Sequence, residues 1–584
     1  MGKIFKLIFI GTVFIFLPFF VWADSSGQQR NFFVNSDYDF SKRKEISATL
    51  RLATSKLYFY IDNEWWSSLE EQKKQEVEKS LIFLGDEFYY RIYPNLTSVF
   101  DSEWRPGIDN DFNITVLIHP MKKEARGYFQ DADEYPKAQS PFSNEREMVY
   151  LNADYIASPL AKSFLAHEFI HLITFNQKEK KYGIKEEVWL NETRAESAPT
   201  LVGYDEQYEG SYLQERVRIF SEEPSDSITE WQGTSADYGA LNLFTQYLVE
   251  KYGTKILADS LKSGKTGIES LNEALKNNGF SQDFSQIFTD WTVAVLANDC
   301  SLGEKYCYKN KNLKSIQVVP SINFLPLQGK TTLGVNQSAK NWSGNWFKFF
   351  GGKGTLKIEF IGSPDNLFKI PYLLKDTSGK YSLGFFSLDQ YQRGEISIPN
   401  FGKDINSATI IPSVQAKISG FLNPEPSIPF FWEVSTVIET EEPKESSSSK
   451  YLDKPILEMT KEEILAKVSE INELLNQLNA QLSKMGEPKE EPTVITCQQF
   501  DRDLYFGIRN DSQVKCLQEF LKSQGSDIYP EGLITGNFLS LTKEAVVRFQ
   551  EKYKAEILAP LNLEMGTGFF GSLTRQVVNK LINW

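Results

Sequence analysis

The feature that most constrains this chain is the pentapeptide HEFIH at residues 167–171, which lies inside an apolar segment. Ser158 and Pro159 are typical of a helix start, and apolar residues then recur at helical spacing over residues 160–175. Histidines four residues apart lie on one face of a helix, so both imidazoles can bind one metal ion. Glu168 lies one position round the helix, where its carboxylate can reach a water at that ion. The alternative is a histidine pair satisfied within a core, but the chain has only three histidines in total.

The motif requires a third ligand, because a catalytic zinc site takes three protein ligands and leaves a fourth position open. His167 and His171 would be two of them, and no histidine follows them in the chain. A downstream carboxylate must therefore complete the set. The segment WLNETRAE at residues 189–196 offers Glu192 and Glu196, which are four apart and so lie on one helical face. The alternative for this acidic pair is a solvated helix surface.

This segment resembles the second zinc helix of the gluzincins, a clan of zinc metallopeptidases. The resemblance assigns Glu192 as the third ligand and places Glu196 where the clan's supporting carboxylate steadies a ligand histidine. Thr193 stands where the family more often has glycine. Within the clan, the likeness is greatest to the hyicolysin-type secreted peptidases and covers most of residues 50–300. It rests on GYF at 127–129, SNEREMVY at 143–150, AHEF at 166–169 and WLNE at 189–192.

The resemblance also implies the reaction. Zinc (Zn²⁺) lowers the pKa of its water to about 7 and polarises the scissile carbonyl, while Glu168 acts as general base. Tyr238 is expected to stabilise the oxyanion, because residues 236–253 are similar to the helix that carries the oxyanion tyrosine in aminopeptidases of the clan. Tyr204 is the reserve candidate, and an ordinary packing role for Tyr238 is the alternative in a chain with 26 tyrosines. His119 lies among apolar strand residues and is interpreted as structural.

At 584 residues the chain is long enough for several domains. Lys3 and Lys6 precede an apolar run that ends at small residues around Ala23, which predicts a cleaved secretory signal at residues 1–23. The alternative is an uncleaved membrane anchor, which needs about 20 apolar residues; this run is shorter and contains Pro18. We therefore expect a protein that is secreted or held in the cell envelope, without a transmembrane helix after signal cleavage.

Residues 24–312 mix strand and helix patterns. The segments 56–61 and 112–118 are rich in β-branched and aromatic residues and are predicted strands, while 69–93 has helical spacing after a serine cap at 67–68. Together with the zinc motif, this α+β pattern predicts a zincin-like catalytic domain.

Residues 313–438 change to short alternating strands between turns, for example at 355–360, 395–398 and 430–434. Regular short strands of this kind predict a β-sandwich. The segment contains no histidine and no cysteine, so we expect no catalytic residue in it.

A linker rich in Glu, Pro and Ser is predicted at 439–453. It leads into a helical spacer at 454–485, in which 460–484 carries apolar residues at heptad spacing. Three heptads are marginal for a coiled coil, so the spacer either docks on itself or forms a weak dimer. A second linker follows at 486–495.

Residues 496–584 contain an internal echo, because TGNFLSLTK from Thr535 recurs as TGFFGSLTR from Thr567, each copy before a predicted helix at 544–553 or 576–582. The segment resembles small three-helix peptidoglycan-binding domains. The resemblance rests on these two motifs and on QVKCLQEFL at 513–521, YPEG at 529–532 and AVVRFQ at 545–550. It departs from the family at Leu539 and Asn510. It implies peptidoglycan as a partner, although such domains also serve as protein-interaction modules.

Four cysteines form two local pairs, which predicts disulfides Cys300–Cys307 and Cys497–Cys516 in an exported protein; free buried cysteines are the alternative. The net charge of −14 gives no electrostatic footprint for nucleic acid.

The predicted fold class is therefore multidomain: an α+β zincin-like catalytic domain, a β-sandwich, a short helical or coiled-coil spacer and a small helical peptidoglycan-binding-like domain. The predicted function is that of a secreted zinc endopeptidase, acting on protein or peptide substrates and tethered to the cell wall. One alternative is a zinc cell-wall peptide hydrolase, although enzymes of that kind space their ligands differently and use more histidines. The other is a wall-binding protein with a degenerate catalytic domain, which would have no need to keep both histidines and both glutamates.

Overall fold

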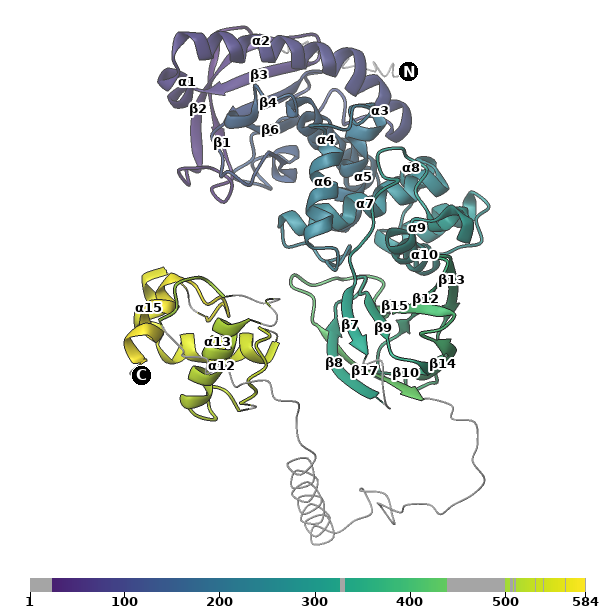
Figure 1. The fold of residues 1–584 in the computed structure, drawn as a ribbon. Helices are drawn as coiled ribbons and strands as arrows, with labels where there is room; N and C mark the ends of the chain where they lie inside the picture. The colour runs from purple at the N-terminus through teal and green to yellow at the C-terminus, as the bar shows by residue number, and fades with distance from the viewer. Residues whose placement is uncertain are drawn as a thin grey trace, which may run out of the picture. The chain divides into compact units, whose positions relative to one another are not determined.

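The structure of the chain is a computed structural model, which describes residues 24–325, 331–437, 499–504, 508, 511–530, 532–538, 540–561, 563 and 565–582. The chain divides into two compact units, residues 1–443 and 444–584 (Figure 1). The predicted signal segment, both linkers, the spacer at 454–485 with its dimer hypothesis, and Cys497 lie outside the described residues.

The first unit begins with a six-stranded mixed sheet of order β1-β2-β3-β4-β6-β5 (Figure 1). The strands β3, β4 and β6 run parallel, and β5 pairs antiparallel with β6 as the last strand at one edge. The predicted strands at 56–61 and 112–118 are confirmed as β3 and β4. The strands are β1 (Gln29–Phe33), β2 (Glu45–Ala53), β3 (Leu57–Asp62), β4 (Ile114–His119), β5 (Gly127–Phe129) and β6 (Met148–Asn152).

Helices cover one face of this sheet, with α2 (Glu71–Glu87) lying along it (Figure 1). Side chains of β3 and β4 alternate between two cores: Phe59 and Val116 pack in a core shared with Leu81 of α2, whereas Tyr60 and Leu117 pack in a smaller cluster on the opposite face. Because both faces are covered, every residue of β3 and β4 is buried.

The helix predicted over 69–93 is in fact divided. The α-helix α2 gives way to a wider π-helical segment, Phe88–Ile92, before α3 (Tyr93–Phe100). The predicted cap at Ser67 and Ser68 is wrong, because these serines end a short helix α1 (Asn63–Ser68) and donate back to its carbonyls.

A helical layer completes the first part of this unit. The predicted helix at 160–175 is confirmed as α4 (Ala161–Thr174), whose residues are almost all buried. It starts after Ser158, whose hydroxyl accepts a hydrogen bond from the backbone of Leu160 (3.2 Å). The other helices are α5 (Val188–Leu201), α6 (Tyr212–Glu222), α7 (Ser235–Tyr252), α8 (Lys255–Leu261), α9 (Gly267–Asn277) and α10 (Phe284–Ala297).

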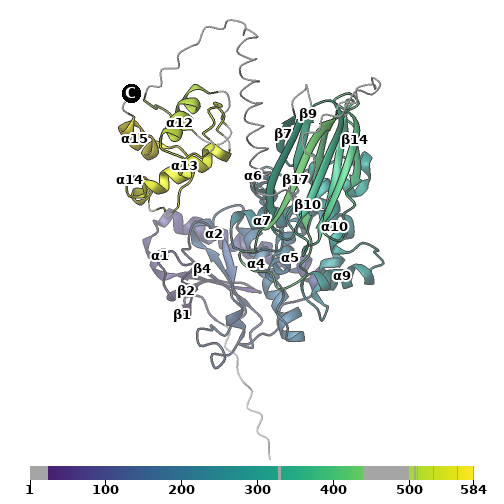
Figure 2. The same cartoon turned by 90° about the horizontal axis from the view of Figure 1, so that it is seen from below.

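The second part of the unit is a nine-stranded curled sheet with the form of a half-barrel (Figure 2). The predicted strands are confirmed, but the β-sandwich predicted for residues 313–438 is wrong. The strands form one sheet, since β14 and β15 are joined through the single pair Phe401↔Ile405. The curl encloses one core, in which Trp432 contacts Phe349 at 5.0 Å between ring centroids. The strands are β7 (Ser321–Leu325), β8 (Thr331–Ala339), β9 (Phe347–Gly351), β10 (Gly354–Gly362), β12 (Pro371–Asp376), β13 (Tyr381–Phe385), β14 (Arg393–Phe401), β15 (Ile405–Ile410) and β17 (Ile428–Val437), with β11 (Phe368–Lys369) and β16 (Ser413–Val414) as a separate pair.

The curled sheet is fixed to the helical layer by polar and aromatic contacts. Trp346 donates its indole N–H to the carbonyl of Thr292 in α10 (3.0 Å), and Ser227 donates to the carbonyl of Asn341 (2.6 Å). The predicted disulfide Cys300–Cys307 is confirmed after α10. Among helices of the described residues, none has both the length and the apolar character needed to cross a membrane.

The second unit is helical, and its two sequence copies make the same contacts. Gln518 accepts hydrogen bonds from the backbone nitrogens of Thr535 and Gly536 at 2.7 and 2.9 Å. Gln550 accepts from the nitrogens of residues 567–568 at 2.8 and 2.9 Å. A buried glutamine thus holds each turn that leads into the next helix. The helices are α12 (Ser512–Ser523), α13 (Ser540–Lys552), α14 (Lys554–Ile557) and α15 (Ser572–Leu581), so the two predicted helices begin four residues earlier than expected.

Candidate metal centre

The helices α4 and α5 pack against each other and bring the three predicted ligands together. One ligand atom from each of His167, His171 and Glu192 lies within 4.8 Å of the others. The Nε2 atom of His167 is 3.2 Å from Oε2 of Glu192, and that of His171 is 3.7 Å from Oε1 of the same carboxylate. Two buried imidazoles and one partly buried carboxylate thus converge on one point and could hold a metal ion.

The other ring nitrogen of each histidine faces a polar side chain. Nδ1 of His167 lies 3.4 Å from Oε1 of Glu196, and Nδ1 of His171 lies 3.1 Å from the side-chain oxygen of Asn191. Such partners hold the ring orientation and select the tautomer in which Nε2 is the ligand atom. Glu196 thus lies beside a predicted ligand histidine, the position that the gluzincin resemblance implied for it. The contact of Asn191 was not predicted.

Glu196 is fully buried and is held by a polar network from two other helices. Arg216 of α6 donates to both carboxylate oxygens, at 2.9 and 3.0 Å, and Asn242 of α7 donates at 2.9 Å. Tyr212 also donates its hydroxyl to this carboxylate. Burial alone would raise the pKa of Glu196, but the positive charge of Arg216 and the contact with His167 lower it to about 2. None of these three partners was predicted from the sequence.

Glu168 lies beside the edge strand β5. A Cβ atom at Gly127 would be 2.8 Å from Oε1 of Glu168 and 2.7 Å from the carbonyl oxygen of Tyr150, so only glycine allows this close approach. Burial raises the pKa of Glu168 to about 8, while the neighbouring charge of His167 opposes the rise. The carboxylate thus faces both the ligand cluster and the sheet edge.

Tyr238 lies at the start of α7, near the ligand cluster. Its ring centroid is 6.3 Å from that of His167, and its ring packs against Trp231 (4.7 Å) and the guanidinium of Arg216 (4.6 Å). Burial and then the charge of Glu192 raise the pKa of Tyr238 well above its ordinary value. The reserve candidate, Tyr204, donates its hydroxyl to Glu87 (2.7 Å), so that hydroxyl is already engaged.

A second tyrosine, Tyr38, reaches this region from the loop between β1 and β2. Its ring stacks on Tyr128 of β5, with centroids 4.8 Å apart. Burial, followed by the charges of Glu168 and Glu192, raises the pKa of Tyr38. Tyr38 is far from residues 167–171 in the sequence, so no local sequence pattern could have predicted that it lies near them.

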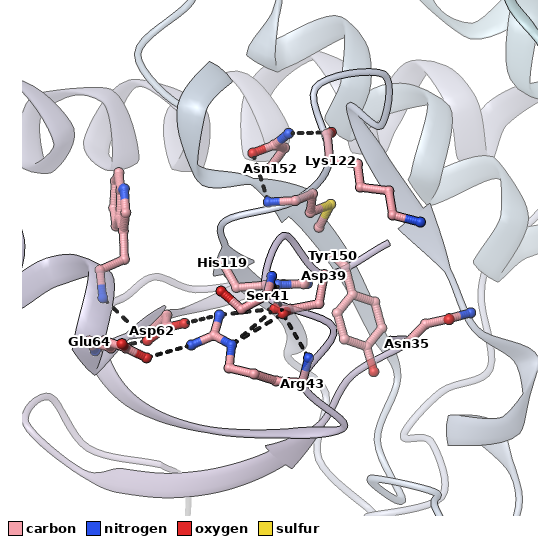
Figure 3. A network of polar contacts seen from close by, with 12 residues as sticks. Asn35, Asp39, Ser41, Arg43, Asp62, Glu64, His119, Lys122, Tyr150 and Asn152 are labelled. Carbon is pink, nitrogen blue, oxygen red and sulfur yellow. Dashed lines mark hydrogen bonds and ion pairs between the residues drawn. The ribbon is translucent and has the colours of Figure 1, made fainter. Parts of the chain in front are cut away.

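A network of ion pairs around the buried Asp39 fixes this loop (Figure 3). Asp39 accepts from Arg43 at 2.9 Å and contacts Nδ1 of His119 at 3.2 Å. Arg43 also pairs with Asp62 (2.7 Å) and Glu64 (3.0 Å). The interpretation of His119 as structural is confirmed, since its side chain is fully buried in β4 and supports the loop rather than the ligand cluster.

A cavity of about 210 Å³ lies beside the ligands and is lined in part by His171. The rings of Phe129 and Phe175 form apolar portions of its wall, and Lys185 and Asp131, which form an ion pair, contribute charge. The arrangement can accept a small side chain next to the ligand cluster.

The chain matches no protein-family model and no curated protein. Among solved structures, the pre-peptidase C-terminal domain of a collagenase from Bacillus anthracis has 8% identity and a TM-score of 0.14, with 20% of this chain and 96% of that chain covered. A periplasmic inhibitor of g-type lysozyme from Aeromonas hydrophila has 11% identity and a TM-score of 0.12, covering 20% and 98%. A 4-O-methyl-α-glucuronidase has 9% identity and a TM-score of 0.12, covering 55% and 51%. Scores this low assign neither fold nor function, so the functional argument rests on the site itself.

Proposed function

We propose that the first unit is a zinc-dependent peptidase with a zincin-like fold. The observation that carries the proposal is the convergence of His167, His171 and Glu192 within 4.8 Å, with Glu168 on the same helix as the histidines. Two imidazoles and one carboxylate are the donor set of a class of catalytic zinc sites that keep one position open.

The residues fit such an ion. The carboxylate oxygen Oε2 of Glu192 is buried and accepts no hydrogen bond from the described residues. His167 directs Nε2 toward this oxygen and His171 directs Nε2 toward Oε1 of the same carboxylate, while Nδ1 of each ring faces Glu196 or Asn191. When bound, zinc supplies Lewis acidity that activates a water molecule and polarises a carbonyl group.

Side chains of the protein carry out proton transfer, oxyanion stabilisation and positioning of the ligand His167. Glu168 takes a proton from the attacking water and gives it to the leaving amine, as a general base that becomes a general acid. Tyr238 donates its hydroxyl to the oxyanion that develops on the scissile carbonyl. Glu196, itself held by Arg216, keeps the ring of His167 in place.

The edge strand β5 favours an extended peptide as substrate. It is the last strand of the sheet, and an unpaired strand edge can add a further strand from a bound peptide. Gly127 at one end of β5 lies against Glu168, and Phe129 at the other end stacks near His171, with centroids 6.3 Å apart. A peptide paired with β5 would therefore pass both residues, with a side chain in the adjacent cavity.

We further propose that the protein is secreted and that its second unit, resembling a peptidoglycan-binding domain, attaches it to the cell wall. The disulfide Cys300–Cys307 is consistent with an extracellular protein, and the paired Gln518 and Gln550 contacts support the internal repeat on which the resemblance rests. Retention of the full chain on purified peptidoglycan, and loss of retention when residues 496–584 are removed, tests this part.

One experiment separates the peptidase from a cell-wall hydrolase. The full-length chain with zinc is incubated either with a denatured protein or with purified peptidoglycan, and the products are identified by mass spectrometry. We expect cleavage of peptide bonds between L-amino acids in the denatured protein. Release of wall peptides without cleavage of the protein would support the hydrolase, and no cleavage of either would support a degenerate site.

A further inference from the structure

Two buried glutamates, Glu134 and Glu147, lie beside each other in the loop that joins β5 to β6. Glu134 closes the short 3-10 helix Asp131–Glu134, and Glu147 directly precedes β6. Glu134 is only 2% exposed, and neither of its carboxylate oxygens has a hydrogen-bond partner among the described residues. Oε2 of Glu147 is buried and unpartnered in the same way. No N–H or O–H donor of the described residues therefore reaches these three carboxylate oxygens.

No positive side chain of the described residues forms an ion pair with either glutamate. Arg146 is engaged elsewhere, with Asp24 (2.7 Å) and the hydroxyl of Thr115 (2.9 Å). The surrounding acids add negative charge, since the charges of Asp109 and Asp133 both raise the pKa of Glu134.

The raised pKa values of these carboxyl groups agree with the absence of a nearby positive charge. Burial, and then the charge of Glu147, raises the pKa of Glu134 well above its ordinary value, and burial raises that of Glu147 to about 7. The pKa of Asp109 is raised to about 6, again by burial first. Two such carboxylates either share a proton or bind a cation between them.

We propose that Glu134 and Glu147 bind a calcium ion. Calcium takes oxygen ligands, including carboxylates in one-atom or two-atom contact, and its variable geometry suits a site formed by two side chains with water and backbone oxygens. Magnesium retains most of its water shell, which a site as buried as Glu134 does not favour. Asp133 is not a ligand, because its two oxygens already accept from Tyr150 (2.5 Å) and Asn144 (2.8 Å).

The local backbone supports this position for Glu147. The N–H of Ile108 donates to Oε1 at 2.8 Å and leaves Oε2 available. Gly107 has φ +94°, and a Cβ atom there would overlap Oε2, so this position must remain glycine for the carboxylate to lie where it does.

Calcium bound here would join three segments: the loop at 107–108, the 3-10 helix ending at Glu134, and the start of β6 at Glu147. It would therefore fix the loop that follows β5, the strand that carries Gly127 beside Glu168. The inferred site is structural and shares no ligand with the His167 cluster.

The test measures the melting temperature of the full-length chain after calcium is removed on a chelating resin, with zinc restored to one fixed concentration in all samples. Adding calcium to about 5 mM, above the 10⁻⁴–10⁻³ M range of extracellular calcium modules, should raise the melting temperature by about 2–4 °C. The same addition of magnesium should have a much smaller effect. Isothermal titration calorimetry should show that this site binds one calcium ion per chain.

The double variant Glu134→Gln/Glu147→Gln should lose both the rise and the bound calcium. Its control, Glu78→Gln/Glu269→Gln, changes the net charge equally at two exposed positions and should keep both. The proposal is overturned if the control loses the rise, if only magnesium produces it, or if calcium leaves the melting temperature of wild type unchanged and stability falls as the pH rises toward 7. The last result would identify a shared proton. The wild-type titration decides the matter even if the double variant does not fold.

Discussion

Oε1 of Glu196 lies 3.4 Å from Nδ1 of His167, so a carboxylate of α5 faces this ring nitrogen while Nε2 of the same ring lies 3.2 Å from Glu192. If zinc binds as proposed, Glu196 acts through the ring of His167 and is not itself a ligand, so Glu196→Ala should weaken zinc affinity about 10–100-fold without abolishing binding. Glu192→Ala, which removes a ligand, should release the metal. Competition with a chromophoric chelator measures both affinities; the opposite order would exchange the roles of Glu192 and Glu196.

The ion pair between Arg216 and Glu196 predicts a large loss of stability when only one partner is removed. Arg216→Met leaves a buried carboxylate without its main positive partner and should lower the free energy of unfolding by about 3–5 kcal/mol. The double variant Arg216→Met/Glu196→Gln should recover much of this loss, since both charges are absent. Urea unfolding of the metal-free proteins measures the difference, and equal losses in the single and double variants would refute this coupling.

Tyr238 and Tyr38 both lie near the acidic residues of the site, and their roles can be separated kinetically. Tyr238→Phe should lower kcat by about 10²–10³-fold with little change in KM, which is typical of a lost oxyanion donor. Tyr38→Phe retains the ring that stacks on Tyr128 and should change kcat less than about threefold by the same argument. A large loss of kcat in Tyr38→Phe alone would transfer the oxyanion role to that residue.

The ligand cluster could be predicted in large part because its members follow local spacing. His167, Glu168 and His171 lie within one helix, and Glu192 and Glu196 lie four apart in the next. Choosing Glu192 as the ligand required a family resemblance, since spacing alone treats the two acids equally.

The supporting network could not be predicted from spacing, because Arg216 and Asn242 come from two further helices. One signal was nevertheless present. Arg216 occupies the apolar face of α6 together with Tyr212 and Ile219, and a charged residue at such a position requires a buried partner. The identity of that partner depends on how the helices pack, which the sequence pattern does not contain.

The sheet arrangement of residues 313–438 likewise could not be predicted from local sequence patterns. Strand positions at 355–360 and 430–434 follow from alternation, but alternation does not say whether strands form two sheets or one that curls on itself. The connection through Phe401 and Ile405 decides this, and it involves a single residue pair.

Gly127 tests the position of Glu168 through sterics alone. Gly127→Ala would place a methyl group 2.8 Å from Oε1 of Glu168, so the carboxylate must move and kcat should fall about 10–100-fold, as small misplacements of catalytic groups do. Zinc content should be unchanged. Gly264→Ala is the matched control, because a Cβ atom at Gly264 would have no heavy atom of the described residues within 4 Å beyond its chain neighbours. Equal activity of both variants would argue against this packing.

The raised pKa of Glu147 predicts how stability depends on pH in calcium-free buffer. Its folded pKa of about 7 lies above the ordinary value of 4.5, so the folded state binds the proton more tightly than the unfolded state. Stability should therefore fall as the pH rises from 4.5 to about 7, by no more than about 3 kcal/mol. Glu147→Gln should flatten this part of the profile, as measured by urea unfolding at a series of pH values. An unchanged slope in the variant would show that other groups are responsible.

The central claim is that Glu168 acts as the base at a zinc ion held by His167, His171 and Glu192. Its most direct test compares wild type with Glu168→Gln for zinc content and for digestion of a denatured protein. We predict one zinc per chain in both proteins, with digestion by wild type and a loss of at least about 10³-fold in Glu168→Gln. Wild-type activity in Glu168→Gln, or a wild-type protein that binds no zinc, would rule out this role for Glu168.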